Sequence, residues 1–216
     1  DLNWDKRKEF LNPTPPRKIK PEQVGLNQED LSQAKQLIEK QAGKGKIIIY
    51  GDYDVDGLTA TALLWRTLRK KGYDVLPYIP DRIEDGYGLN KQTIEKLVDK
   101  HEDLSMFITV DNGIVAHQAV EFAKDKGIKV LVTDHHLAQE EKPVADLILH
   151  TTEISGCGVA WFLANQFGYK GLSLVAIGTI GDMLPLIDAN RSFVKYGLKE
   201  LESPHEVGLQ ELKKAA

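Results

Sequence analysis

Short apolar runs alternate with longer amphipathic stretches along most of the chain. The runs are three to five residues long and most are rich in β-branched side chains, which is typical of strands buried on both faces. The stretches between them place apolar residues at helical spacing. We expect strands at 46–49, 75–79, 106–110, 130–133 and 147–149, and helices at 28–43, 58–71, 91–100 and 115–126. Because helices of this length connect parallel strands, the pattern predicts an α/β fold. The expected architecture is an open, mainly parallel five-stranded sheet with helices on both faces, followed by a helical C-terminal part.

The first 27 residues differ from the rest in composition. They are polar and contain four prolines, each of which fixes its own φ and restricts the residue before it. We therefore expect residues 1–27 to form an extended N-terminal arm across the surface of a single domain at residues 28–216.

Ionisable residues follow three of the five predicted strands. The carboxyl ends of parallel strands lie at the same edge of a sheet, so these residues should converge on one crevice. Three aspartates within five residues repel one another unless a cation neutralises them, and carboxylate oxygens suit Mg²⁺ or Mn²⁺. An Asp-rich turn is the alternative interpretation of any one strand end, but the convergence of three favours a metal site. The residues are Asp52, Asp54 and Asp56 after the first strand, Asp111 after the third, and Asp134, His135 and His136 after the fourth.

The histidine pair extends this chemistry. One histidine can bind a metal through a ring nitrogen while a carboxylate accepts its other N–H, and a second histidine can donate to a phosphate oxygen. A polar strand end with two surface imidazoles is the alternative.

Composition restricts the classes of protein. The formal charge of −4 does not indicate a nucleic-acid binder, although cations bound at a carboxylate site would restore positive charge. The single cysteine, Cys157, excludes an internal disulfide framework and fits a reducing cytoplasm. No apolar stretch approaches the roughly 20 residues of a membrane span. We therefore expect a cytoplasmic protein with no membrane partner.

Four segments in order resemble the four motifs of the DHH phosphoesterases, and the resemblance is closest to the RecJ-type single-strand-specific exonucleases. Residues 80–89, 155–160 and 190–198 extend this resemblance. The four segments are residues 50–57, 109–113, 134–136 and 178–183.

The resemblance implies a role for each matching position in a site for two divalent metal ions, Mn²⁺ or Mg²⁺. It implies that Asp54 binds one ion, Asp56 the other, and Asp111 both. His135 and Asp182 would complete the shell of the second ion, Asp134 would orient His135, and His136 would face the scissile phosphate. Many relatives carry a histidine at the position of Tyr50, so Asp52 is the candidate for the missing ligand.

Two further residues are candidates for substrate contact. The guanidinium group of Arg82 can grip a pair of phosphate oxygens, and Tyr87 can stack on a base. The alternatives are a surface arginine in a flexible loop and a tyrosine that anchors the loop.

The function implied by the resemblance is metal-dependent hydrolysis of phosphodiester bonds through two-metal-ion activation of water. The expected protein is a 5′–3′ exonuclease on single-stranded DNA that acts in DNA repair and recombination, with single-strand-binding protein or other repair proteins as further partners. One alternative is a DHH phosphoesterase for short oligonucleotides, dinucleotides or pyrophosphate. Another is an inactive replication or repair scaffold, against which the complete set of motif carboxylates argues.

The chain departs from the family in two places. Only residues 150–154 separate the fifth strand from Ser155, where RecJ-type proteins have a longer segment. The second, substrate-binding domain of the family is also expected to be absent from this chain. Residues 28–216 are thus expected to be the catalytic domain alone, with weaker binding of long DNA.

Overall fold

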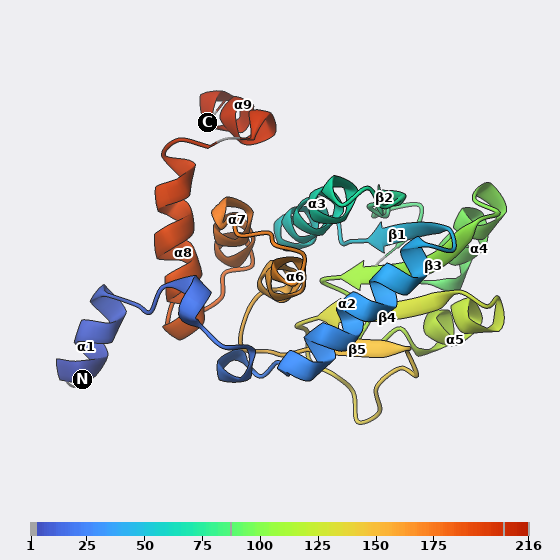
Figure 1. Cartoon of the computed structure of the whole chain (residues 1–216), viewed down its shortest axis with the longest axis horizontal. Coiled ribbons are helices and arrows are strands. Elements are labelled where there is room, and N and C mark those ends of the chain that lie inside the picture. The colour runs from blue at the N-terminus through green and yellow to red at the C-terminus, as the bar shows by residue number, and fades with distance from the viewer. Residues whose placement is uncertain (1–3, 87, 205, 216) are drawn as a thin grey trace.

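The computed structural model describes residues 4–86, 88–204 and 206–215, and its centre is a five-stranded sheet (Figure 1). The sheet order is β2-β1-β3-β4-β5 and every neighbouring pair is parallel. The predicted parallel α/β sheet is therefore confirmed. The strands are β1 (Lys46–Tyr50), β2 (Val75–Tyr78), β3 (Leu104–Val110), β4 (Lys129–Asp134) and β5 (Leu147–His150).

Helices cover both faces of the sheet, as predicted. Because successive side chains of a strand point to opposite faces, Ile47 and Ile49 of β1 join one apolar core while Ile48 and Tyr50 join the other. The first core includes side chains from α2 (Gln28–Ala42), α3 (Val55–Lys70) and α6 (Gly156–Asn165). The second includes α4 (Lys91–Lys100) and α5 (His117–Asp125).

The C-terminal part is helical, also as predicted. It comprises α7 (Ser173–Gly181), α8 (Asp188–Leu201) and α9 (Val207–Ala215). The rings of Trp161 and Phe193 meet edge to face with centroids 5.3 Å apart, which fastens α8 to α6. Helix α7 packs on both α3 and α8, and its last residue, Gly181, lies against Val55 at the start of α3. No helix within the described ranges has the length and hydrophobicity needed to cross a bilayer.

The N-terminal segment is not the extended arm that its prolines predict. It contains helix α1 (Trp4–Leu11) and two 3-10 helices, Pro16–Lys18 and Pro21–Val24. Prolines at the first position of both 3-10 helices begin these turns, since the fixed φ of proline suits a helix start. The segment lies against α8, where Ser192 Oγ donates to the carbonyl of Thr14 (Figure 1).

The switch point of the sheet lies between β1 and β3. The chain moves from β1 to β2 on one side and then crosses to β3 on the other, and ligands of open α/β sheets bind at such a point. Asn112 ties the two strand ends together, because its Nδ2 donates to the carbonyls of Tyr50 (3.2 Å) and Val110 (3.0 Å). The acidic loop after β1 and Asp111 after β3 therefore face each other across this crevice.

Candidate metal centre

The acidic loop after β1 runs directly into helix α3. Asp54 is the N-cap, and its side chain accepts a hydrogen bond from the backbone N–H of Gly57 at 2.9 Å. Gly57 has no room for a side chain, because an added Cβ would lie 2.6 Å from the backbone nitrogen of Asp52. Cap and glycine together fold the loop tightly enough to bring three carboxylates to one strand end.

Asp56 lies in the first turn of α3 and is 1% exposed. Its Oδ2 accepts from the backbone N–H of Gly156 (2.6 Å) and its Oδ1 accepts from that of Cys157 (3.0 Å). Both donors belong to the N-terminus of α6, which favours negative charge. Burial nevertheless raises the pKa of Asp56 above its usual range, against the lowering effect of these hydrogen bonds.

Asp111, directly after β3, is fully buried, and its backbone N–H donates to the carbonyl of Thr133 at 3.0 Å. Among the described residues neither carboxylate oxygen has a hydrogen-bond partner, and the backbone adopts a left-handed φ of 64°. Burial raises the pKa of Asp111 far above its usual range, and the charges of Asp56 and Asp54 raise it further. A buried carboxylate without donors is costly, so its environment fits a bound cation.

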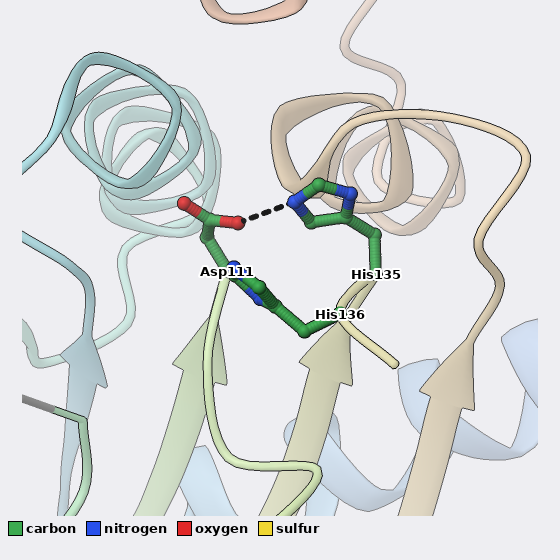
Figure 2. Close-up of side chains that lie close together, drawn as sticks. All are labelled: Asp111, His135 and His136. Atoms are coloured by element: carbon green, nitrogen blue, oxygen red, sulfur yellow. Dashed lines mark ion pairs between the residues drawn. The ribbon is translucent and has the colours of Figure 1, made fainter. Parts of the chain in front are cut away.

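His135 faces Asp111 from the end of β4 (Figure 2). Its Nε2 lies 3.1 Å from Asp111 Oδ1, and this nitrogen also has no hydrogen-bond partner among the described residues. The same nitrogen lies 3.7 Å from Asp56 Oδ2 and 3.6 Å from Asp182 Oδ2. One imidazole nitrogen thus has three carboxylates around it, which is a suitable donor set for a divalent ion.

Asp182 reaches this cluster from the C-cap of α7, and its side chain is 25% exposed. Ligand atoms of Asp56, His135 and Asp182 all lie within 4.8 Å of one another. Those of Asp52, Asp54 and Asp111 form a second such group. The structure therefore brings together all six residues predicted as metal ligands, in two adjacent groups.

Asp134 has a different partner from the one expected. Its Oδ1 lies 2.8 Å from Nδ1 of His136, whereas it meets His135 only through the backbone N–H, at 2.7 Å. The expectation that Asp134 orients the ring of His135 is thus wrong, because the turn after β4 directs the next ring to it. Asp134 Oδ2 accepts from the backbone N–H of Ile114 at 2.8 Å, so the carboxylate is held at both oxygens.

His136 is the more accessible histidine, with 42% of its side chain exposed. The hydrogen bond to Asp134 raises the pKa of His136 above its usual range, although burial opposes the shift. Burial alone would raise the pKa of Asp134, but the bonds from His136 and Ile114 hold it below its usual range. Both shifts favour an imidazolium paired with a carboxylate.

Replacing Asp134 with asparagine should lower the pKa of His136 toward about 6.5, the value of an unperturbed imidazole. Because the pKa of His136 is raised in the folded state, the pair stabilises the fold below the unfolded-state pKa. That contribution is lost as the pH rises through the folded-state pKa. An NMR titration of the His136 ring in the presence of a chelator measures the shift, and an unchanged pKa in Asp134→Asn would refute the pairing.

Much of the sequence from β1 onward matches a known protein family. The sequence profile of the DHH family, N-terminal domain, matches residues 46–179. This chain belongs to the DHH family. The matched segment extends from β1 into α7 and includes every candidate metal ligand except Asp182.

Relatives within the family are described as single-stranded-DNA-specific exonuclease RecJ. The protein from Bacillus subtilis is 41% identical over 191 residues, which cover 82% of this chain and 24% of the relative. The protein from Thermus thermophilus is 38% identical over 201 residues, covering 86% of this chain and 30% of the relative. The chain thus spans about a quarter to a third of the length of these relatives.

Solved structures give the same result for the fold. A structure of exonuclease RecJ bound to manganese matches with a TM-score of 0.77 at 35% identity, covering 86% of this chain and 51% of that one. RecJ from Thermus thermophilus in complex with Mn²⁺ matches with a TM-score of 0.77 at 32% identity, covering 98% of this chain and 32% of that one.

Tyr50, which the family resemblance singled out as a departure from an expected histidine, is turned away from the carboxylates. Its hydroxyl donates to the carbonyl of Gly88 at 3.0 Å, and its ring packs in the core beneath α4 and α5. Burial raises the pKa of Tyr50 to about 12, so the phenol is neutral at pH 7 and a poor metal ligand. Asp52, which is buried beside Asp54 and Asp111, remains the candidate replacement.

Of the two residues predicted to contact substrate, Arg82 lies in the loop after β2. Arg82 is exposed, and its guanidinium carbon lies 5.4 Å from the centre of the Tyr53 ring. Tyr87 lies outside the described residues.

Two backbone groups of this DHH domain escaped the sequence analysis. The N–H groups of Gly156 and Cys157, which hold Asp56, belong to a segment that extended the family resemblance but received no role in the site. Ser155 supplied a usable signal, because a serine before an apolar run is a common N-cap and a helix N-terminus attracts carboxylates. The sequence did not indicate which carboxylate would reach the N-terminus of α6.

Proposed function

We propose that residues 28–216 are the catalytic domain of a metal-dependent exonuclease that removes nucleotides from the 5′ end of single-stranded DNA. The observation that carries the proposal is the buried carboxylate of Asp111, whose two oxygens lack hydrogen-bond donors among the described residues. This carboxylate lies where three other ligand candidates meet, namely Asp52, Asp54 and His135. The RecJ relatives are described as exonucleases specific for single-stranded DNA, and this supplies the substrate class.

Two divalent cations, Mn²⁺ or Mg²⁺, fit the two ligand groups. Asp52 and Asp54 would hold one, Asp56, His135 and Asp182 the other, and Asp111 would contact both. When bound, a pair of such ions activates water and neutralises charge on the leaving oxygen. The unpartnered atoms of Asp111 and His135 support this assignment, since both kinds of atom are ligands that Mn²⁺ accepts.

The chain itself supplies a cationic donor for the substrate. Asp134 keeps the His136 ring protonated at Nδ1, so its other ring nitrogen can donate to a phosphate oxygen. Arg82 offers a second, planar donor. His136 would thereby orient the scissile phosphate, and its exposure leaves room for that contact. A role in DNA repair and recombination, a cytoplasmic location and contact with single-strand-binding protein belong to the same proposal.

Hydrolysis of two 5′-labelled substrates in Mn²⁺, a dinucleotide and a long single-stranded DNA, tests this function. We expect nucleotide release from the long strand with Mn²⁺ and none in excess chelator. Cleavage of the dinucleotide alone would indicate a phosphoesterase for short substrates and not an exonuclease. The short connection between β5 and α6 would leave an open site for such substrates. Cleavage of neither substrate by a protein that binds Mn²⁺ would contradict both, and would favour an inactive scaffold.

A further inference from the structure

The ring of Tyr53 connects an exposed arginine to the candidate metal centre. Tyr53 lies between Asp52 and Asp54, two members of one ligand group, and its backbone N–H donates to Asp52 Oδ1 at 2.7 Å. The guanidinium carbon of Arg82 lies 5.4 Å from the centre of the ring, within cation–π range. The ring therefore binds a positive charge at the residue between two candidate ligands.

The backbone around Arg82 is fixed independently of this contact. Asp81 Oδ1 accepts from the N–H groups of Ile83 (2.8 Å) and Glu84 (3.0 Å), which closes a turn around the arginine. Asp85 accepts from the hydroxyl of Tyr78 at 2.7 Å and pairs with Lys96 at 2.8 Å. The loop is thus anchored on both sides of Arg82, while the arginine side chain is exposed and takes its direction from the Tyr53 ring.

We propose that Tyr53 is a positioning residue that holds the Arg82 guanidinium beside the metal centre, where it binds a phosphate of the substrate strand. This inference rests on the proposed function. A long side chain loses rotamer freedom when it binds a ligand, and a contact that orders it beforehand reduces that cost. The planar guanidinium can stack on the ring and still present its N–H edge to phosphate oxygens, which a lysine ammonium cannot do in the same way.

Steady-state kinetics on a 5′-labelled single strand test the inference. Tyr53→Ala should raise KM by about 2- to 5-fold, the equivalent of one exposed cation–π contact, and leave kcat within a factor of about two. Arg82→Ala should raise KM at least as much. Tyr53→Phe should keep the affinity because it retains the aromatic face, whereas Tyr53→Leu, which keeps the apolar bulk, should behave like Tyr53→Ala.

A double variant separates positioning from an independent contact. If Tyr53 acts through Arg82, adding Tyr53→Ala to Arg82→Ala should raise KM no further. The matched control is Arg69→Ala, which removes an exposed arginine 5.5 Å from the Trp65 ring in the last turn of α3, away from the site, and should leave KM unchanged.

Three results would overturn the inference. One is an unchanged KM in Tyr53→Ala with hydrolysis intact. Another is a double variant whose increase in KM equals the product of the two single-variant increases. In both cases the proposed function would stand. The third is a lack of hydrolysis by the unaltered chain on every strand tested, which would overturn the proposed function and this inference with it.

Discussion

Replacing Asp111 with alanine should reduce phosphodiester hydrolysis by about 10³-fold or more, and the protein should still unfold cooperatively. Removal of a single transition-state hydrogen-bond donor lowers the rate by roughly 10²–10³-fold. The loss here should be larger, because Asp111 is the carboxylate shared by both ligand groups. Stability should change little, since no described hydrogen bond to the carboxylate is broken and the cost of burying it is removed.

Asp111→Asn provides the companion variant. Asparagine tolerates the left-handed backbone at this position better than alanine does and keeps the shape of the side chain, but lacks the charge. Single-turnover assays in Mn²⁺, with thermal melts in a chelator, measure the two properties separately. Undiminished turnover in a folded Asp111 variant would refute the two-metal assignment.

Replacing Asp56 with alanine should abolish hydrolysis and also destabilise the fold by about 2–6 kcal/mol in the absence of metal. The buried N–H groups of Gly156 and Cys157 would lose their acceptor, and each unsatisfied buried donor costs roughly 1–3 kcal/mol. Asp56 therefore differs from Asp111, although both are buried aspartates of the same site. Asp56 is part of the connection between α3 and α6, whereas no hydrogen bond from the described residues holds the carboxylate of Asp111.

Urea unfolding in a chelator measures this difference as a change in the free energy of unfolding. Asp74→Ala is the control, because Asp74 is an exposed carboxylate whose ion pair with Lys46 should contribute at most about 1 kcal/mol. If Asp56→Ala were as stable as the Asp111 variants, the structural role of Asp56 would be wrong.

The strands and their pairing were predictable because apolar β-branched runs leave little choice. The helix expected at 91–100 has the predicted bounds, whereas α3 begins at Val55 and not at 58. The difference arises from Asp54, whose N-cap bond draws the acidic residues into the first helical turn. The acidic residues, which resemble only a turn in the sequence, therefore form both the turn after β1 and the first turn of α3.

Contacts made only in the folded chain account for the elements that were not predicted. Helix α1 lacks an apolar stripe of its own and lies against α8, where Arg191 donates to the carbonyl of Phe10 at 3.2 Å. The choice of Asp134 between two adjacent histidines depends on the backbone of one turn, which local sequence does not fix. Asp182 came only from the family resemblance, because an aspartate at a helix end is ordinary until tertiary packing brings it to His135.

Anomalous diffraction from crystals of this protein soaked in Mn²⁺ tests the central claim most directly. The account predicts two manganese peaks at the carboxyl edge of the sheet, one among Asp52, Asp54 and Asp111 and the other among Asp56, His135 and Asp182. The Asp111 carboxylate should contact both peaks, and both should disappear or weaken strongly in Asp111→Ala. The absence of manganese from this cluster, or a single ion that leaves Asp111 without a metal contact, would contradict it.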